Sequence, residues 1–255
     1  MNIEGRVAVV VGGASGMARA TAQAIVEHGG GVAILDLPSS AGAAVADELG
    51  KGTTFHPCDV SDFAGTEAAL ADAAQHHGGL HIAVNTAGGG VAERTVGRDG
   101  PHSLASFQRV IELNLVATFN LNRLQAWHMS SNAPDPGGER GVVINTSSIA
   151  AYEGQIGQVA YSAAKAGIAG MMLAMARDLG SLGIRATAIA PSLFATGATA
   201  GISADRQLAM TTGAAFPRRM GHPEEYARLA VAIIENPMLN GTTIRLDGGQ
   251  RFASR

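Results

Sequence analysis

Short, continuously apolar runs alternate with longer alanine-rich stretches along nearly the whole chain. Runs of four or five residues without polar alternation are typical of strands in a parallel sheet that is covered on both faces. Strands that alternate with helices predict right-handed crossovers and a doubly wound sheet. We therefore expect an α/β fold of the Rossmann type, with about seven parallel strands and helices on both faces. The expected strands are residues 7–11, 32–35, 53–56, 82–85, 142–145, 185–189 and 243–246.

The stretches between these runs have the length and the apolar spacing of helices. Neither a linker rich in proline and glycine nor an internal repeat divides the 255 residues, so we expect residues 1–255 to form a single domain. The expected helices are residues 17–28, 40–49, 63–77, 104–129, 158–179 and 223–235.

The composition argues against several classes of function. A net charge of −3 with only two lysines gives no basic surface, so no nucleic-acid partner is expected. The single cysteine, Cys58, excludes a disulfide scaffold and a cysteine-rich zinc site, and no metal is expected. The longest uncharged stretch, residues 186–204, is interrupted by Pro191, so no membrane partner is expected. Because residues 7–11 fit a strand better than a signal peptide, we expect a cytoplasmic protein.

Three connecting segments are longer than this layout requires: residues 88–103, 131–140 and 192–221. The first and third follow the carboxyl ends of strands, where open α/β sheets bind their ligands. We expect both to border a substrate, with residues 192–221 as the substrate lid. The middle segment precedes a strand and is expected at the surface or at a subunit contact. Tolerated surface insertion is the alternative for all three.

A glycine-rich turn that begins at Gly12 directly follows the first expected strand. Glycines let a backbone turn sharply and approach a pyrophosphate, whose charge is favoured at the N-terminus of the next helix. Asp36 ends the second expected strand, 20 residues after Gly16, where a carboxylate would bind the adenosine ribose hydroxyls. Because a carboxylate repels a 2′-phosphate, NAD is favoured over NADP as the cofactor. A simple turn residue before Pro38 is the alternative for Asp36.

Tyr161 and Lys165 are four residues apart in an expected helix, so both side chains lie on one face. Tyrosine has a pKa of about 10 and is neutral at pH 7. A neighbouring ammonium, aided by an oxidised nicotinamide, stabilises the phenolate and lowers that pKa. The tyrosine can then exchange a proton with a substrate alcohol or carbonyl. The alternative is a coincidental surface pair, which the rarity of both residue types disfavours.

Two further polar positions complete a candidate catalytic set. Ser148 lies just past the fifth expected strand, where a hydroxyl can stabilise charge that develops on a substrate oxygen. The residues alone do not separate Ser148 from Ser147. Asn114 lies inside an expected helix, in which asparagine competes for backbone hydrogen bonds. A local distortion there would let a water link Asn114 to Lys165 as a proton relay, whereas a satisfied buried amide is the alternative.

Together these residues resemble the short-chain dehydrogenase/reductase family, along essentially the whole chain. Asn114, Ser148, Tyr161 and Lys165 match the catalytic tetrad of the family, whose spacing selects Ser148 over Ser147. The resemblance implies a nicotinamide cofactor, with adenine contacts at Asp59-Val60. The cofactor-binding residues that it implies are Gly12, Ser15, Gly16, Met17, Asp36, Leu37, Asp59, Val60, Asn85, Ala87, Gly88, Tyr161, Lys165, Pro191, Leu193 and Thr196.

The chain departs from the family pattern at three positions. Val11 stands where a threonine is usual, which removes a hydroxyl that ties the glycine-rich turn to the region of Asn85. Ala18 replaces the third glycine of the turn, and Ser192 replaces the glycine that usually follows Pro191. Because alanine is small enough for close helix–strand packing, we expect weaker cofactor affinity at most.

Within the family, the chain resembles most the branch of type 2 3-hydroxyacyl-CoA dehydrogenases, also called 17β-hydroxysteroid dehydrogenases of type 10. Members of that branch are NAD-dependent homotetramers of fatty acid metabolism that oxidise 3-hydroxyacyl-CoA thioesters, with side activity on steroid alcohols. The branch implies that Ser148, Gln155 and Tyr161 face the substrate. The runs that carry this closer resemblance are residues 36–38, 107–110, 135–138, 153–158, 233–237, 239–241 and 245–248.

These observations predict an NAD-dependent dehydrogenase that acts on a secondary alcohol, in particular a 3-hydroxyacyl-CoA. Arg94 and Arg98, in segment 88–103, are candidates to meet the CoA phosphates, although exposed arginines are more often only solvated. One alternative is a 3-oxoacyl or other carbonyl reductase that uses NADPH, against which Asp36 argues, or a hydroxysteroid dehydrogenase of the same family. The other is a non-catalytic binding protein on the same fold, against which the intact tetrad argues.

Overall fold

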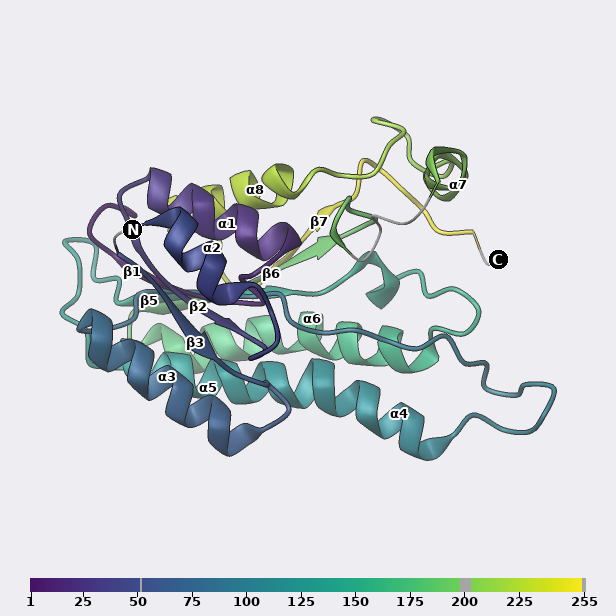
Figure 1. The fold of residues 1–255 in the computed structure, drawn as a ribbon, viewed down its shortest axis with the longest axis horizontal. Coiled ribbons are helices and arrows are strands. Elements are labelled where there is room, and N and C mark those ends of the chain that lie inside the picture. The colour runs from purple at the N-terminus through teal and green to yellow at the C-terminus, as the bar shows by residue number, and fades with distance from the viewer. Residues whose placement is uncertain (51, 198–202, 254–255) are drawn as a thin grey trace.

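A seven-stranded, entirely parallel sheet forms the centre of the molecule in the computed structural model, which describes residues 1–50, 52–197 and 203–253 (Figure 1). The strand order is β3-β2-β1-β4-β5-β6-β7. The expected fold class, including the number of strands, is thereby confirmed. The strands are β1 (Val7–Val11), β2 (Gly31–Asp36), β3 (Thr53–Pro57), β4 (Ile82–Asn85), β5 (Gly141–Thr146), β6 (Ile184–Pro191) and β7 (Thr243–Leu246).

Helices cover both faces of this sheet (Figure 1). On one face, α1, α2 and α8 pack over residues such as Val10 and Ile34, and on the other α3 and α5 pack over residues such as Val9 and Leu35. Because neighbouring residues of one strand are buried on opposite faces, the strands are apolar throughout. The helical segments are α1 (Gly16–Glu27), α2 (Gly42–Leu49), α3 (Phe63–His77), α4 (Leu104–Ile111), η1 (Glu112–Val116), α5 (Ala117–Ser130), η2 (Ile149–Ala151), α6 (Val159–Gly180), α7 (Ala204–Met210) and α8 (Pro223–Glu235).

The strand order changes direction between β1 and β4. From β1 the chain proceeds outward to β2 and β3, and it then returns to place β4 on the other side of β1. At such a switch point the loops after the two central strands diverge, and a crevice opens at their carboxyl ends. The topology thus predicts where a ligand binds before any side chain is considered.

The long helix expected over residues 104–129 is divided into three parts. Its middle part, η1, is a π-helix, which is a wider turn with one extra residue. The side chain of Asn114 explains the widening, because its Nδ2 donates to the Val110 carbonyl at 2.8 Å and competes with the backbone for that acceptor. The local distortion expected at Asn114 is therefore present.

The segment 192–221, expected to be a loop, contains the helix α7. The expectation of an irregular segment was wrong here because seven helical residues are hidden between glycine-, alanine- and threonine-rich stretches. Part of the segment, residues 198–202, lies outside the described residues, and the function of a substrate lid stays a prediction.

Among the described residues, one helix is long and apolar enough to cross a membrane by length and composition alone, namely α6. One face of α6 is buried against the rest of the molecule through Ala164, Ile168 and Met172, and it also buries Lys165. Helix α6 therefore packs against the sheet through this face, as a helix of a protein core does.

Candidate active site

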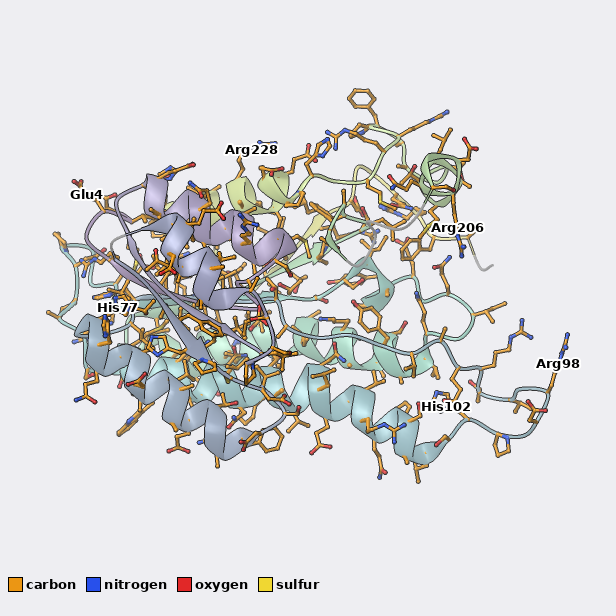
Figure 2. The ribbon with its side chains drawn as sticks, viewed as in Figure 1. Glu4, His77, Arg98, His102, Arg206 and Arg228 are labelled. Atoms are coloured by element: carbon orange, nitrogen blue, oxygen red, sulfur yellow. The ribbon has the colours of Figure 1, made fainter. Side chains whose placement is uncertain are left out.

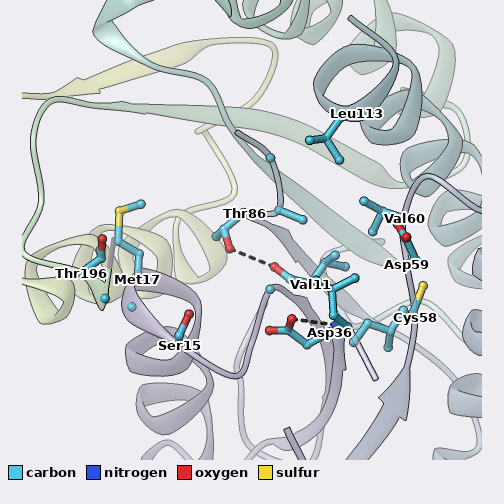
Figure 3. Close-up of a pocket in the computed structure, with 17 residues that line it drawn as sticks. Val11, Ser15, Met17, Asp36, Cys58, Asp59, Val60, Thr86, Leu113 and Thr196 are labelled. Atoms are coloured by element: carbon cyan, nitrogen blue, oxygen red, sulfur yellow. Dashed lines mark hydrogen bonds between the residues drawn. The ribbon is translucent and has the colours of Figure 1, made fainter. Parts of the chain in front are cut away.

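A cavity of about 420 Å³ opens at the carboxyl ends of β1, β2 and β4, where the topology places a ligand. Figure 3 shows Met17 and Thr196 at one end of this cavity, and Asp59 and Val60 at the other. Eleven of its lining residues were expected to bind the cofactor: Gly12, Ser15, Gly16, Met17, Asp36, Leu37, Asp59, Val60, Ala87, Gly88 and Thr196.

The glycine-rich turn brings backbone against backbone at the base of the cavity. Gly12 has φ +82°, and a Cβ on it would lie 2.7 Å from the Thr86 hydroxyl oxygen, so a side chain does not fit. Helix α1 begins at Gly16, and its first N–H groups are directed toward the cavity end of the turn. A pyrophosphate fits this cradle, because unpaired N–H groups and the positive end of the helix favour an anion there.

The hydroxyl that Val11 lacks is supplied by another residue. Thr86 Oγ1 donates to the Val11 carbonyl at 2.9 Å, and the Thr86 N–H donates to the same carbonyl at 3.1 Å (Figure 3). The turn is therefore tied to the end of β4 even though valine replaces threonine. Thr86 is a site residue that was not among those expected, although its neighbours Asn85 and Ala87 were.

Asp36 lines the cavity at the end of β2 and is fixed by two backbone groups. Its Oδ2 accepts from the Ala14 N–H at 2.9 Å, and its Oδ1 accepts from the Leu37 N–H at 2.7 Å. The carboxylate therefore performs the task of a turn residue and still presents a negative charge to the cavity. A carboxylate oxygen can accept further hydrogen bonds, so ribose hydroxyls fit here.

The far end of the cavity is formed by Cys58, Asp59 and Val60. Asp59 Oδ1 accepts from the Ser61 hydroxyl and N–H, and these hydrogen bonds lower the pKa of the Asp59 carboxyl. Burial raises the pKa of the Cys58 thiol, which stays protonated and packs as a small apolar group.

The three expected proton-transfer residues meet beside this cavity. Lys165 is 3% exposed, its Nζ is 5.6 Å from the centre of the Tyr161 ring, and it donates to the Thr146 carbonyl at 2.8 Å. The hydroxyls of Ser148 and Tyr161 are hydrogen-bonded to each other. The spacing of four residues in α6 and the end of β5 therefore bring these side chains together.

Gly88 joins the two halves of the site. It lines the cavity, and a Cβ on it would lie 3.4 Å from Lys165 Nζ and would collide with Asn114 Oδ1. The next glycine but one, Gly90, passes so close to Tyr161 that its Cβ would be 3.0 Å from the ring. Only the glycine backbone around Gly88 therefore separates the catalytic candidates from the space for the cofactor.

Burial dominates the electrostatics of the pair. It lowers the pKa of Lys165 to about 8, because an ammonium is costly in a desolvated site. It also raises the pKa of Tyr161 above its usual value, which the hydrogen bond with Ser148 partly offsets. Without a cofactor, the tyrosine is therefore a neutral phenol at pH 7, and added positive charge is needed to form the phenolate.

The two neighbouring serines differ in direction. Ser147 is buried, and its hydroxyl donates to the Lys165 carbonyl at 2.8 Å, which fixes α6 against β5. Ser148 Oγ instead accepts from the Ala150 N–H at 3.1 Å and faces Tyr161. The structure therefore places Ser148, and not Ser147, beside the reacting group.

Asn114 is clamped to the loop after β4. Its Oδ1 accepts from the Gly89 N–H at 3.1 Å, and its Nδ2 donates to the Gly89 carbonyl at 2.6 Å. These contacts make it a satisfied buried amide, which was the alternative reading, while it also lies next to Lys165 across Gly88. The relay through a water stays a prediction.

Five of the expected cofactor residues do not line the cavity, among them Tyr161 and Lys165, which lie beside it. Asn85 is 4% exposed, and its amide is enclosed by those of Asn122, Gln125 and Asn145 at 3.0–3.1 Å, so its side chain supports the fold instead of touching a ligand. Pro191 and Leu193 are also absent from the lining. Strand position alone did not show which way these side chains point.

Gln155, expected to face the substrate, lies where two further hollows meet, of about 520 and 440 Å³. Arg94 lines the first of them. Arg98 lies at the outer end of the long loop formed by residues 88–103, away from the sheet (Figure 2). Within the described part of the chain, no group of three or more His, Cys, Asp or Glu side chains is arranged to hold a metal ion.

Comparison with known proteins gives consistent results. A profile of the family described as short chain dehydrogenase matches residues 6–207. The chain is 48% identical to 3-hydroxyacyl-CoA dehydrogenase type-2 of Homo sapiens, an alignment that covers 98% of this chain and 97% of the human one. The crystal structure of 3-hydroxyacyl-CoA dehydrogenase type-2 from Mycobacterium avium is 42% identical and has a TM-score of 0.95 over 98% of both chains.

A more distant solved structure contains a cofactor. It is a 7α-hydroxysteroid dehydrogenase in complex with NADH and 7-oxo glycochenodeoxycholic acid, and it is 27% identical to this chain, with a TM-score of 0.88. The match covers 100% of this chain and 98% of the other.

Proposed function

The chain belongs to the short-chain dehydrogenase family and is an oxidoreductase, and from that premise we propose that it oxidises 3-hydroxyacyl-CoA thioesters with NAD. The observation that carries the proposal is the meeting of Ser148, Tyr161 and Lys165 beside a cavity whose rim carries Asp36. The relatives named type-2 3-hydroxyacyl-CoA dehydrogenases, at 42% and 48% identity over 98% of the chain, support the substrate class.

Asp36 and the glycine-rich turn support NAD as the cofactor. The N-terminus of α1 would hold the pyrophosphate, and Asp36 would accept hydrogen bonds from the adenosine ribose. A 2′-phosphate would meet the Asp36 carboxylate at close range, which disfavours NADP. When bound, the nicotinamide supplies the acceptor for the hydride that leaves the alcohol carbon.

The residues of the chain itself handle the proton. Tyr161, as the phenolate, takes the proton of the substrate hydroxyl at its Oη. The Nζ of Lys165 lies 5.6 Å from the centre of the Tyr161 ring. When Lys165 is protonated, its positive charge lowers the pKa of the Tyr161 phenol. Ser148 donates a hydrogen bond to the substrate oxygen and thereby orients it. In the reverse direction Tyr161 returns the proton to the carbonyl oxygen.

NADH oxidation with acetoacetyl-CoA tests this function, with NADPH and a 3-oxosteroid measured in parallel. We expect turnover with NADH and the thioester, and its loss by a factor of about 10³ or more in Tyr161→Phe, which lacks the proton donor. Tyr152→Phe is the matched control, because it removes a phenol hydroxyl from an exposed ring and should stay active.

Each other outcome has a defined meaning. Turnover of the steroid but not of the thioester would contradict the proposed substrate class and still support a dehydrogenase. A preference for NADPH would contradict the part assigned to Asp36. Turnover that persists in Tyr161→Phe would contradict the mechanism.

We extend the proposal to a homotetramer that lies in the cytoplasm. Large apolar side chains stay exposed on helices that cover one face of the sheet, among them Phe119 and Trp127 on α5 and Leu173 on α6. Trp127 is 75% exposed, which is unusual for the one tryptophan of a chain poor in aromatic residues and favours a subunit contact. The unpaired, buried Cys58 fits a reducing compartment.

A further inference from the structure

Residues 247–253, which we call the C-terminal strap, leave β7 and cross to the segment that follows Ser148. Figure 1 shows them in yellow beside α7, on the side of the molecule where the long loop projects. The strap contributes no residue to the catalytic set. Its contacts nevertheless join three parts that border the substrate side of the site.

Four charged side chains hold the strap to residues 152–158. Glu153 Oε1 pairs with Arg245 Nη1 at 2.7 Å and with Arg251 Nε at 3.3 Å. Asp247 Oδ2 pairs with Arg245 Nε at 2.7 Å and with Arg251 Nη1 at 3.2 Å. The two arginines therefore lie between the two carboxylates in a closed cluster, and the charges balance.

Glu153 also holds the backbone of the strap. Its carboxylate accepts from the Phe252 N–H at 3.1 Å. Burial acts to raise the pKa of the Glu153 carboxyl, but the hydrogen bonds from Arg245 and the Phe252 N–H outweigh burial and leave that pKa below its usual value. The side chains of Glu153 and Asp247 are 20% and 10% exposed, so water screens the cluster less than an ordinary surface pair.

The strap is anchored on its other side to the region of α7. Gln250 is 2% exposed, and its Nε2 donates to the carbonyl of Met210, the last residue of α7, at 2.9 Å. The Arg251 N–H donates to the Gly213 carbonyl at 3.2 Å. The strap thus connects the region of α7 to the segment that carries Glu153. Together with Gln155, the strap and α7 line a hollow of about 440 Å³.

Gln155 receives the end of the strap. Its Nε2 donates to the Ala253 carbonyl at 3.2 Å, and its backbone N–H donates to Gln158 Oε1 at 3.0 Å. One amide N–H is thereby occupied, which fixes the side-chain amide so that Oε1 and the second N–H remain for a ligand. Among the described residues, the contact with Ala253 is the one hydrogen bond that holds this side-chain amide in its orientation.

We propose that Glu153 is a positioning residue that acts through the C-terminal strap on Gln155, and thereby sets the affinity for the part of the substrate remote from the reacting carbon. The inference rests on the proposed function, because it takes Gln155 to face the substrate. Glu153 touches neither Tyr161 nor Lys165 in any of its described contacts, so its effect falls on binding and not on proton transfer.

A double-mutant cycle tests the proposal, with Glu153→Gln, Gln155→Ala and the two combined, assayed with acetoacetyl-CoA and NADH. We expect Glu153→Gln to raise KM about fivefold and to leave kcat within about twofold, as the loss of a partly buried charged hydrogen bond gives. In the Gln155→Ala background, Glu153→Gln should have no further effect on KM, because the two residues act in series. Glu153→Asp should restore part of the affinity.

Glu48→Gln is the matched control, since it breaks the Arg19–Glu48 ion pair between α1 and α2 and should change no kinetic constant. Effects of Glu153→Gln and Gln155→Ala that multiply in the double variant would overturn the proposal, as would a fall in kcat at unchanged KM.

Hydrogen exchange gives a readout that needs no substrate. In Glu153→Gln, amides of residues 152–158 and of the strap should exchange faster together, while those of α6 stay protected. Coupled exchange in a protein that fails to reduce acetoacetyl-CoA would retain the strap as a positioning element and reject only the proposed substrate. Unchanged exchange at residues 152–158 would reject the strap itself.

Discussion

Just past the end of β5, two adjacent hydroxyls point in different directions and have different tasks. Ser148→Ala removes a donor to the reacting oxygen, and we expect kcat to fall about 100-fold with little change in stability. Ser147→Ala removes the hydrogen bond to the Lys165 carbonyl, so it should cost about 1 kcal/mol of stability and retain most turnover. Steady-state kinetics and thermal unfolding of both variants check the pair. An equal loss of kcat in the two would contradict the assignment.

The pH dependence of the reaction follows from Tyr161 and Lys165. Alcohol oxidation needs the phenolate, so its kcat/KM should rise with pH, whereas carbonyl reduction needs the phenol and should fall. Burial raises the pKa of Tyr161 in the protein alone, and only positive charge nearby brings it down. Lys165, with a pKa of about 8, loses its charge over the pH range around 8, so the pKa values observed in the pH profile belong to the pair.

Lys165→Met separates the effect of burial on the pKa of Tyr161 from the effect of the Lys165 charge. It should move the rise of kcat/KM for alcohol oxidation upward by about one pH unit or more, because the phenolate loses its charged neighbour. A profile that does not move would show that the ammonium has no electrostatic part in the reaction. Binding of NADH, followed by fluorescence, controls for loss of the cofactor.

Asp36 controls the choice of cofactor through a single negative charge. Asp36→Asn keeps the shape and one backbone hydrogen bond, and the NADPH/NADH ratio of kcat/KM should rise about tenfold or more, as about 1.4 kcal/mol of lost repulsion gives. A ratio that stays constant would show that another group excludes the 2′-phosphate. Thermal unfolding without cofactor distinguishes a local change from unfolding of the turn.

At the scale of elements, Arg185 of β6 holds the carboxyl end of α8. It is 6% exposed and donates to the carbonyls of Ile233 and Ile234 at 2.8 and 2.7 Å, while its Nε pairs with Glu139 at 2.7 Å. These carbonyls end a helix and have no partner within it. Arg185→Met should therefore cost about 3 kcal/mol or more of the free energy of unfolding.

Denaturant unfolding measures that cost, and Arg228→Met is the control. Arg228 lies on the same helix, is 71% exposed and pairs with Glu225 only at 3.8 Å, so its loss should cost about 0.5 kcal/mol at most. Equal losses in the two variants would contradict the part assigned to Arg185.

The elements themselves could be predicted to different degrees. Strands β1, β4 and β7 and helices α3 and α8 have the expected bounds, because apolar runs flanked by polar or glycine residues mark them. The π-helix could be foreseen only as a distortion at Asn114, since its cause is a side chain that takes a backbone acceptor. Helix α7 could not be foreseen, because its seven residues give too short a periodic pattern.

For the whole molecule, the exposed face of α5 predicts the behaviour of the assembly. Trp127→Glu places a charge in a face expected to be buried between subunits, so the mass in solution should fall from that of a tetramer. Light scattering after gel filtration measures the mass. Gln23→Glu adds the same charge on α1, on the other side of the sheet, and should leave the mass unchanged. A wild-type monomer would reject the proposed assembly.

The site could be predicted where residues repeat a spacing and not where distant segments meet. Gly12, Asp36 and the four catalytic candidates follow from spacing and motif, because strand ends and helix turns place them. The cluster of Glu153 with Arg245 and Arg251 joins parts nearly a hundred residues apart, and no local pattern signals it. The same holds for the direction of the Asn85 amide.

The wholly parallel sheet has a consequence for how the chain reaches this structure. Among the strands that the structure describes, no two neighbours are joined by a tight hairpin, so every ladder must wait for a crossover to be completed. β1 is made first on the ribosome, yet Val11 meets Asn85 of β4 only after three helices and two strands have followed. Folding dominated by such distant contacts is slow. We expect the apolar β1 to remain uncovered on one edge for much of synthesis, where a chaperone or another nascent chain can reach it.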